Sequence, residues 1–399
     1  MPTLLQINVT CNSGSTGKIA EQIGSLALKN GWRSIIAYSR GNAESESETI
    51  KIGNRLNIYW HGIESRIFDN HGLSSRLATK KFVKRILEIS PDIIHLHNIH
   101  GYYLNYKILF EFLKKYNRPI VWTLHDCWAF TGHCGHFTMA NCYKWKTQCF
   151  DCPLKKDYPK SFLFDRSRQN YIDKKESFTG LRNLHIVSVS NWLNEIVKES
   201  FLNYANLHVI NNGIDISKFS PCEKNKNGKF AILGVSNVWD ESKGLYDFFK
   251  LRKLLPEDFS ITLVGLTKGQ LKNLPEGISG ITRTESQKEL ANLYSKSDVL
   301  ISLSHAETFG LTIAEAYACG IPAIVYDNTA LPELIPNNNS TGFIVKTGDV
   351  ESVAFAVKKL KGSPILAANC RKRAETLYDK NIAFGKYLEL YEKILNHAF

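Results

Sequence analysis

Short apolar segments alternate with longer amphipathic segments along the first half of the chain. The apolar segments have the length and composition of buried strands and lie at 3–9, 33–39, 92–98, 120–125, 185–190 and 207–213. The segments between them place apolar residues at helical spacing, as Ile19, Ile23 and Leu26 do within 18–30. This alternation predicts a parallel sheet covered by helices on both faces.

The alternation begins again after a polar segment at 217–229, which contains proline and glycine and is typical of a linker. Further strands are expected at 230–236, 260–265, 298–304, 322–327 and 342–345. The predicted fold class is therefore α/β, with two Rossmann-like doubly wound domains that face each other across a cleft. We place the first domain at 1–215, the second at 216–375, and a C-terminal helix that packs back on the first domain at 376–399.

The charge balance favours an anionic partner, because 50 lysine and arginine residues stand against 38 aspartate and glutamate residues and give a net charge of +12. A nucleic acid, an anionic membrane face or a phosphorylated substrate would fit. No zinc-finger spacing, RNP motif or recognition helix supports a nucleic-acid partner. Basic residues gather at 80–85, 154–175 and 224–229, and the second cluster mixes them with aromatic residues, as membrane-binding surfaces do. Ordinary solvated faces would explain these clusters equally well.

No apolar run approaches the roughly 18 residues that span a bilayer, and the N-terminus lacks the pattern of a signal peptide. We therefore expect a cytoplasmic protein, with peripheral association at the inner face of the cytoplasmic membrane as a hypothesis. In that compartment the nine cysteines are expected to be reduced thiols or metal ligands rather than a disulfide framework.

Four of the cysteines gather shortly after the predicted strand at 120–125. Cys149 and Cys152 have the C-x-x-C spacing of half a zinc site, and Cys134 and Cys142 would complete a tetrahedron. The cluster is therefore a candidate for a closed, structural zinc site. Scattered buried thiols, or disulfides under oxidising conditions, are the alternatives.

The most informative stretch is 300–327, where a strand is followed by a helix that begins near Phe309 or Gly310. The first amides of such a helix can hold a phosphate, and a glycine lets an anion approach the backbone. Glu307 precedes the helix, and Glu315 lies inside it, where a carboxylate can accept hydrogen bonds from sugar hydroxyls. A loop glutamate and a solvated helix glutamate are the plainer interpretation. The apolar surroundings of Glu315 nevertheless require a partner for its charge.

Seven residues separate Glu307 from Glu315, and the pair resembles the E-x7-E signature of the retaining family 4 glycosyltransferases, which have the GT-B fold. Three other segments resemble the same family in the same order: "TLHDCWAF" at 123–130, "VSVSNWL" at 187–193 and "NNGID" at 211–215. The ordered set covers most of the chain and is far more specific than any one member. It implies a glycosyltransferase of the hexosyltransferase type that acts in bacterial surface polysaccharide synthesis.

The resemblance implies that the second domain binds a UDP- or GDP-sugar donor. The diphosphate would contact the backbone amides of Phe309, Gly310 and Leu311. Glu315 would bind the ribose hydroxyls, and Glu307 would contact the donor sugar. The acceptor, a glycan carried on a polyprenyl diphosphate, would bind the first domain.

The family also places an arginine and a lysine on the diphosphate, and this chain keeps only one of them. Lys243 matches the lysine, whereas Asn237 or Val238 stands near the place of the arginine. Another basic residue such as Arg283 or Lys268 would have to supply the second charge. A plain surface lysine is the alternative interpretation of Lys243.

Polar residues also follow two predicted strands of the first domain. His125 and Asp126 follow one strand, and a histidine there can donate a hydrogen bond to a sugar hydroxyl or stabilise charge near a leaving group. The resemblance implies that His125 contacts the donor sugar; a capping or core histidine is the alternative. His97 and Asn98 follow the other strand and, with Asp126, are expected on the acceptor side, whereas His95 should point into a helix layer.

No Asp-x-Asp pair occurs in the chain, so we expect helix amides and Lys243, rather than a divalent metal, to hold the diphosphate. No cofactor is then required for catalysis. A sugar-nucleotide epimerase with the GT-B fold is the alternative enzyme, and a basic nucleic-acid-binding protein is the alternative from another class.

The stretch "CNSGSTGK" at 11–18 invites comparison with a nucleotide-binding P-loop. That motif needs four residues between its glycines and a Ser or Thr after the lysine. Here two residues separate Gly14 from Gly17, and Ile19 follows the lysine. In the family this loop faces the cleft, so Gly14 and Gly17 are candidates to approach the donor diphosphate, and Thr16 is expected to cap the following helix.

Overall fold

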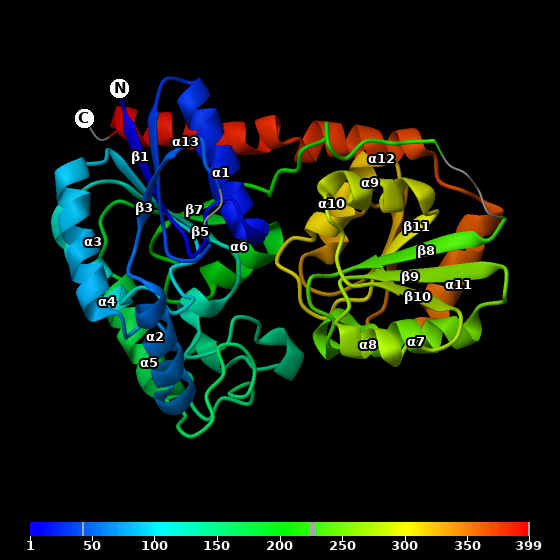
Figure 1. The fold of residues 1–399 in the computed structure, drawn as a ribbon. Helices are drawn as coiled ribbons and strands as arrows, with labels where there is room; N and C mark the ends of the chain where they lie inside the picture. The colour runs from blue at the N-terminus through cyan, green and yellow to red at the C-terminus, as the bar shows by residue number, and fades with distance from the viewer. Residues whose placement is uncertain (42–43, 224–227, 398–399) are drawn as a thin grey trace. The chain divides into compact units, whose positions relative to one another are not determined.

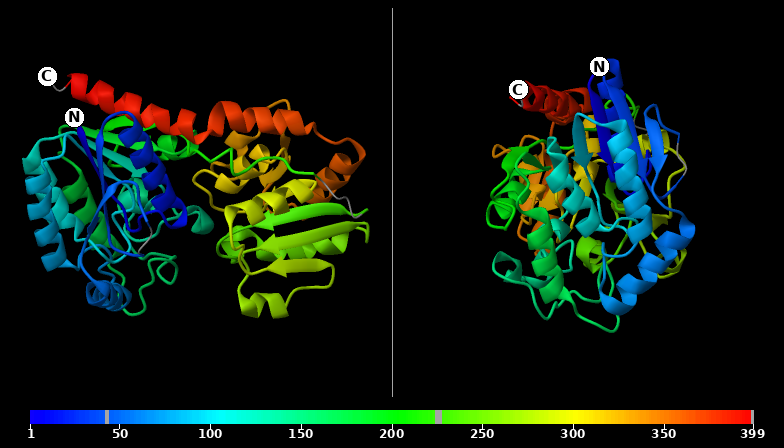
Figure 2. Two further views of the ribbon diagram at one scale, coloured as in Figure 1. Left: turned by 45° about the horizontal axis from the view of Figure 1, so that its top comes forward. Right: turned by 90° about the vertical axis from the view of Figure 1, so that its left-hand side faces the viewer.

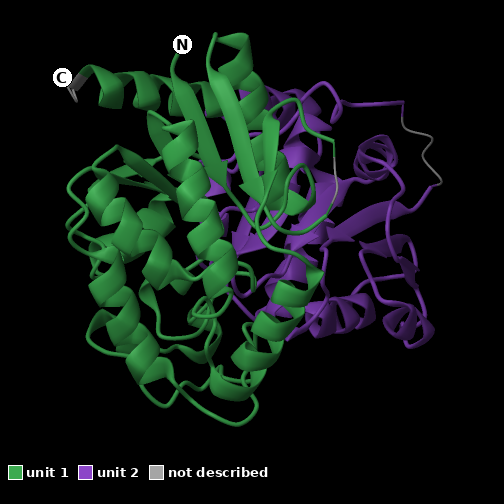
Figure 3. Cartoon of the chain, turned by 60° about the vertical axis from the view of Figure 1, so that its left-hand side comes forward, with its two compact units in different colours: residues 1–211, 384–399 green, residues 212–383 purple. Residues whose placement is uncertain are grey.

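The computed structural model describes residues 1–41, 44–223 and 228–397, so residues 224–227 of the basic cluster expected at 224–229 lie outside the described part. The chain forms two compact units, drawn in green and purple in Figure 3. Unit 1 contains residues 1–211 and 384–399, and unit 2 contains residues 212–383. The sequence pattern predicts that the first domain ends at residue 215 rather than 211. It predicts that the C-terminal segment that returns to this domain begins at residue 376 rather than 384.

Unit 1 is built on a seven-stranded sheet in the order β3-β2-β1-β4-β5-β6-β7, in which every pair of neighbouring strands is parallel (Figure 1). The strands are β1 (Thr3–Ile7), β2 (Arg33–Tyr38), β3 (Glu48–Lys51), β4 (Ile93–Leu96), β5 (Ile120–Leu124), β6 (Leu184–Ser188) and β7 (Asn206–Val209). All residues of the central strands β4 and β5 are buried, as expected for a parallel sheet covered on both faces.

Helices from both ends of the chain share the core of unit 1. The helices are α1 (Gly14–Lys29), α2 (Arg55–Phe68), α3 (Arg76–Ile89), α4 (Tyr106–Tyr116), α5 (Ser167–Phe178), α6 (Asn191–Lys198) and α13 (Lys380–His397). Ile23 of α1 and Tyr391 of α13 pack in one apolar cluster with Leu4, Ile93 and Val121 of the sheet, so α1 and α13 cover the same face (Figure 2).

A buried polar contact joins α13 to this sheet. The ring of His95 in β4 has its Nε2 atom 2.8 Å from Thr123 Oγ1 and its Nδ1 atom 2.6 Å from the hydroxyl of Tyr391. Both ring nitrogens are therefore satisfied inside the core. This confirms that His95 points into the helix layer.

Unit 2 repeats the architecture with a six-stranded parallel sheet in the order β10-β9-β8-β11-β12-β13. Its strands are β8 (Phe230–Val235), β9 (Phe259–Val264), β10 (Ile278–Ile281), β11 (Val299–Ser302), β12 (Ala323–Tyr326) and β13 (Gly342–Val345). Its helices are α7 (Leu245–Leu254), α8 (Lys268–Lys272), α9 (Gln287–Lys296), α10 (Leu311–Ala318), α11 (Val350–Gly362) and α12 (Ala367–Arg373). The predicted α/β class with two Rossmann-like domains is confirmed.

Each sheet has one place where the strand order reverses, and this place decides which loops meet. In unit 1 the reversal lies between β1 and β4, and in unit 2 it lies between β8 and β11. Connections from these two strands run to opposite sides of the sheet, which leaves a crevice at their carboxyl ends. A ligand-binding site is therefore expected at the loops after β1 and β4 in unit 1, and at the loops after β8 and β11 in unit 2.

The edge strands β3 and β10 carry no clear apolar alternation, which is why the sequence pattern does not predict them. In β3 three of the four residues are exposed, and β10 contains a glycine. None of the helices in the described ranges combines the length and apolar character that are needed to cross a membrane.

Candidate active site

The loops after β8 and β11 are held together by a close backbone approach at Gly244. This residue has φ of 71°, and a Cβ atom on it would lie 2.3 Å from the carbonyl oxygen of Leu303. The amide of His305 also donates to the carbonyl of Ser242 over 2.7 Å. The sequence Lys243-Gly244 is therefore required locally, because only glycine lets the lysine reach the end of β11.

Lys243 and Glu307 form an ion pair at the reversal point of unit 2. Lys243 Nζ lies 2.5 Å from Glu307 Oε1 and 3.2 Å from the carbonyl oxygen of Ala306. The two side chains are 26% and 28% exposed, so the pair is partly open to solvent. Thr329 Oγ1 accepts a hydrogen bond of 3.0 Å from the amide of Glu307 and fixes the loop. The structure thus brings together two residues that the sequence separates by more than sixty positions.

The N-terminus of α10 lies directly after this pair. Gly310, with φ of 106°, is the N-cap residue and provides no side-chain cap. The amides of Phe309, Gly310 and Leu311 donate to no atom of the described residues. Free amides and the positive end of the helix dipole are the elements of an anion site.

Glu315 is held one turn further along α10. Its Oε2 atom accepts a hydrogen bond of 2.9 Å from the hydroxyl of Tyr294 in α9, and that tyrosine is fully buried. Burial, and secondarily the nearby carboxylate, raise the pKa of Tyr294 far above its usual range, so it remains a donor. This contact explains how an apolar helix tolerates a carboxylate. The sequence pattern does not reveal Tyr294, because nothing in the spacing of α9 links it to α10.

The place of the missing arginine is not filled from the same loop. Asn237 and Val238 are exposed, and Trp239 is buried with its Nε1 atom donating to the carbonyl of Val264 over 2.8 Å. Lys268 and Arg283 are exposed and make no hydrogen bond or ion pair with Lys243 or Glu307 in the described chain.

The glycine-containing loop of unit 1 follows β1 and opens α1. Gly14 has φ of 66° and no neighbour within 4 Å of an added Cβ atom, so its backbone is accessible. Gly17 is different, because an added Cβ atom would lie 2.6 Å from Thr10 Oγ1. A glycine at position 17 is therefore needed for close packing against Thr10. Thr16 is not the N-cap, which is Ser13; its hydroxyl lies 3.3 Å from Asn8 Nδ2 instead.

His125 and Asp126 follow β5 at the same edge of unit 1. The Nε2 atom of His125 lies 3.2 Å from Nδ1 of His97, and burial lowers the pKa of His125 to about 4. Asp126 Oδ1 accepts from the amide of Trp128 over 2.9 Å, and Asp126 Oδ2 lies 2.9 Å from Nε2 of His100. Burial raises the pKa of Asp126, but His100 and the other donors outweigh it and keep the carboxyl ionised.

His97 and Asn98, expected on the acceptor side, differ in their surroundings. His97 is 1% exposed, and its second ring nitrogen, Nε2, lies 3.1 Å from Gln6 Oε1. Both of its polar atoms are therefore engaged inside unit 1. Asn98 is partly exposed, and its amide donates to Asn8 Oδ1 over 3.3 Å. The sequence pattern does not reveal Gln6, because a glutamine within an apolar strand has no distinguishing signal.

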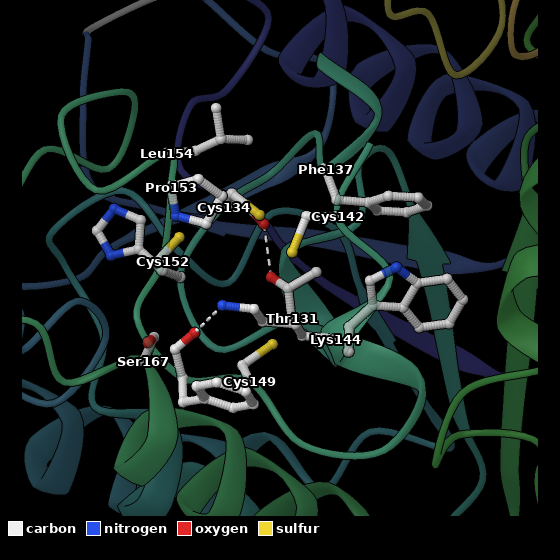
Figure 4. A pocket seen from close by; sticks show the side chains of 13 residues that line it. Thr131, Cys134, Phe137, Cys142, Lys144, Cys149, Cys152, Pro153, Leu154 and Ser167 are labelled. Carbon is white, nitrogen blue, oxygen red and sulfur yellow. Dashed lines mark hydrogen bonds between the residues drawn. The ribbon is translucent and has the colours of Figure 1, made fainter. Parts of the chain in front are cut away.

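The four cysteines of the candidate zinc site line one pocket, shown in Figure 4. They are Cys134, Cys142, Cys149 and Cys152, and His133 lines the same pocket. A hydrogen bond from the Cys134 thiol lowers the pKa of Cys152 to about 7. His133 Nδ1 lies 2.6 Å from Asp69 Oδ1, and no described residue satisfies His133 Nε2.

The donor chemistry of this pocket suits zinc, since thiolates and a carboxylate-oriented histidine are its usual ligands. The placement is less favourable. The described part of the chain contains no group of three or more histidine, cysteine, aspartate or glutamate residues arranged to hold a metal ion. The zinc site therefore stays a prediction.

Comparison with known proteins identifies both halves of the chain. Residues 20–218 match the family model described as Glycosyltransferase Family 4, and residues 218–377 match the model described as Glycosyl transferases group 1. The two models meet near the start of unit 2 and together cover every strand of the two sheets except β1.

Similar proteins extend this result. The chain is 25% identical to the putative colanic acid biosynthesis glycosyl transferase WcaC of Escherichia coli (strain K12), over 98% of this chain and 100% of that protein. It is 26% identical to the UDP-Gal:alpha-D-GlcNAc-diphosphoundecaprenol alpha-1,3-galactosyltransferase of Escherichia coli, over 54% of this chain and 62% of that protein. The sucrose-phosphate synthase of Thermosynechococcus elongatus has the same fold, with a TM-score of 0.74 and 16% identity over the full length of both chains. Nothing among these favours an epimerase or a nucleic-acid-binding protein.

Gly244 offers a test of the Lys243 position. We expect Gly244→Ala to lower the free energy of unfolding of unit 2 by about 1–3 kcal/mol, because the methyl group meets the Leu303 carbonyl and φ is positive. Urea unfolding followed by circular dichroism measures the change. Gly269→Ala is the matched control, since no atom lies closer than 4.0 Å to its added Cβ, and it should leave stability unchanged or raise it by up to about 1 kcal/mol. Equal effects of the two substitutions on stability would contradict the inference that the loop contact at position 244 requires a glycine.

Metal analysis of the purified protein tests the zinc prediction. The prediction is about one zinc per chain in the wild-type protein. The double variant Cys149→Ser, Cys152→Ser should lose that zinc. Cys222→Ser is the control, because this exposed cysteine is not among the pocket residues. Wild-type protein without bound zinc would refute the site.

Proposed function

Because the chain belongs to glycosyltransferase family 4 and has the GT-B fold, we propose that it transfers a hexosyl group from a UDP- or GDP-sugar to a lipid-linked glycan, with retention of configuration. The observation that carries the proposal is the arrangement in unit 2. The Lys243–Glu307 pair lies beside the free amides of α10, and Glu315 is held one turn away. A diphosphate, a sugar and a ribose need these three kinds of group.

The proposed donor complex assigns one task to each element. The diphosphate accepts hydrogen bonds from the amides at 309–311, and Lys243 neutralises part of its charge. Glu307 then exchanges its contact with Lys243 for a hydroxyl of the donor sugar. Glu315 accepts from the ribose hydroxyls while Tyr294 orients its carboxylate.

The chemistry follows from this placement. The bond between the anomeric carbon and the phosphate oxygen breaks, positive charge develops on the sugar, and the acceptor hydroxyl attacks from the face that the leaving group vacates. The hydroxyl proton passes to the departing phosphate oxygen. Helix amides and Lys243 stabilise the leaving diphosphate electrostatically, and positioning supplies much of the remaining effect. These groups replace a divalent metal in the proposal, so activity should persist when EDTA is present.

The acceptor assignment is supported by the names of the relatives. One similar enzyme acts on a diphosphoundecaprenol-linked sugar, and another belongs to colanic acid biosynthesis. We therefore propose surface polysaccharide synthesis and a polyprenyl-diphosphate carrier. Asp126 and the partly exposed Asn98 are the polar groups of unit 1 that would contact the acceptor sugar.

A lipid carrier requires access to a membrane, and unit 1 has an exposed surface that suits one. This α2 surface consists of Leu56, Tyr59, Trp60 and Phe68 of α2 with Phe162, Leu163 and Phe164, each between 46% and 68% exposed. The two segments are joined, since the amide of Phe162 donates to the carbonyl of Arg66 over 2.7 Å.

Exposed basic residues lie in or next to these two segments: Arg55 and Arg66 belong to α2, and Lys156 and Lys160 shortly precede Phe162. Aromatic side chains among basic ones favour an anionic lipid surface, because the rings enter the interface while the cations meet the headgroups. We propose peripheral association through the α2 surface.

Ligand-induced stabilisation tests the donor assignment. In a panel of UDP- and GDP-sugars, at least one is expected to raise the thermal unfolding midpoint, with a shift that grows with ligand concentration. Glu315→Gln should weaken the binding of that ligand by about 1.5–3 kcal/mol, because the hydrogen bonds to the charged carboxylate are lost. Glu351→Gln, an exposed helix position in the same unit, is the control and should bind like wild type.

Absence of any stabilisation of the wild-type protein would oppose the donor assignment. A shift that survives Glu315→Gln would oppose only the ribose role of that residue.

Flotation with liposomes tests the α2 surface. Wild-type protein is expected to float with vesicles that contain anionic lipid, and less so as salt is raised. The double variant Trp60→Ser, Leu163→Ser should lose most of this binding. Phe355→Ser with Leu366→Ser is the matched control, because these two apolar residues are at least as exposed but belong to unit 2. Flotation that is absent in wild type, or lost equally in the control, would refute the proposal.

A further inference from the structure

A continuous chain of polar side chains leads through the core of unit 1 to His125. Gln6 Nε2 donates to the carbonyl oxygen of Ala20 in α1 over 2.8 Å. Gln6 Oε1 lies 3.1 Å from His97 Nε2, and His97 Nδ1 lies 3.2 Å from His125 Nε2. Three neighbouring strands, β1, β4 and β5, supply these side chains at their carboxyl ends, two of them at the strand-order reversal.

The direction of every hydrogen bond in this chain follows from its first member. The carbonyl of Ala20 can only accept, so the amide nitrogen of Gln6 must face it. The oxygen of Gln6 then faces His97 and can only accept, so His97 must carry its proton on Nε2.

His97 has a single ring proton. The side chain of His97 is buried, and burial lowers its pKa well below the ordinary range, so the ring is neutral. With the proton on Nε2, its Nδ1 atom is an acceptor, and His125 must donate from Nε2. A neutral His125 then holds a lone pair on Nδ1.

We propose that Gln6 is a positioning residue that, through His97, fixes His125 as the Nε2–H tautomer. In the proposed transfer, on which this role in catalysis rests, His125 accepts a hydrogen bond from a sugar hydroxyl at Nδ1. This reverses the donor role that the sequence alone suggests for it. The arrangement of protons itself follows from the hydrogen bonds that join Ala20, Gln6, His97 and His125.

The surroundings of His125 agree with a neutral ring. Burial is the largest effect on its pKa and lowers it; His100 lowers the pKa further, and the opposing effect of Asp126 is smaller than that of burial. His95 stacks on His97 with ring centroids 4.0 Å apart but directs its own nitrogens to Thr123 and Tyr391. It therefore offers the chain no competing proton.

Nitrogen-15 NMR of histidine-labelled protein tests the tautomer without any substrate, because the two neutral tautomers give different couplings between ring nitrogens and carbon-bound protons. We expect His125, assigned by its absence in His125→Asn, to be the Nε2–H form at pH 7. It should remain neutral on acidification until the pH approaches about 4. An Nδ1–H form, or a charged ring at pH 6, would overturn the proposal on wild-type protein alone.

Gln6→Met then tests the origin of the tautomer. The variant keeps the side-chain length but removes the acceptor for His97, so a second His125 tautomer should appear. Gln22→Met is the matched control, since Gln22 lies on α1 and its buried Oε1 atom has no partner in the described chain. An unchanged His125 spectrum in Gln6→Met would show that Gln6 does not set the tautomer.

Kinetics separate this result from the proposed function. If transfer activity is found, Gln6→Met should lower kcat by about tenfold with the donor KM within about twofold, because orientation at the reacting sugar is lost while the diphosphate contacts remain. A tautomer change without loss of kcat would overturn the catalytic role. An inactive wild-type protein with the expected spectrum would oppose the proposed function and leave the tautomer assignment standing.

Discussion

The reversal of strand order in each parallel sheet is the constraint on which the rest of this structure depends. Parallel strands place all their carboxyl ends at one edge, and the reversal opens that edge between two neighbouring strands. In unit 2 the loops after β8 and β11 meet there, and Gly244 permits the contact that brings Lys243 to Glu307. In unit 1 the same geometry brings the end of β1 next to the end of β4, with β5 alongside.

The two edges use opposite electrostatic strategies. In unit 2 the ion pair is partly solvated, and the amides of α10 remain available, so charge is ready for an anionic ligand. In unit 1 the histidines are buried, and desolvation keeps His95, His97 and His125 neutral. Neutral rings can still orient one another through defined donors and acceptors, whereas charged rings in the same positions would repel. The strand-end edge of unit 2 therefore carries charged groups, whereas that of unit 1 carries neutral groups with defined hydrogen-bond directions.

Three features of this chain bear on the ligands proposed for it. No arginine stands in the loop after β8 where the resemblance leads one to expect it, since Asn237 and Val238 are exposed there and Trp239 belongs to the core. A pocket of four cysteines lies beyond the loop that carries His125. The α2 surface exposes large apolar side chains, which is costly for a solvated protein unless another surface covers them.

Much of the architecture was readable from the sequence, because the period of apolar residues is a local property. Buried strands such as β4 and β5 stand out as continuous apolar runs, and Glu307 and Glu315 stand out by the seven residues between them. The edge strands β3 and β10 were not readable, since three of the four residues of β3 are exposed and β10 contains a glycine, so neither forms an apolar run.

The partners of the site residues were decided only by the tertiary structure. Tyr294 reaches Glu315 from another helix, and Gln6 reaches His97 from another strand. Such contacts depend on register between strands and on packing between helices, and neither leaves a trace in local composition. The sequence alone therefore determined which residues are candidates for the chemistry, because motif and spacing are local, whereas packing determined their hydrogen-bond partners.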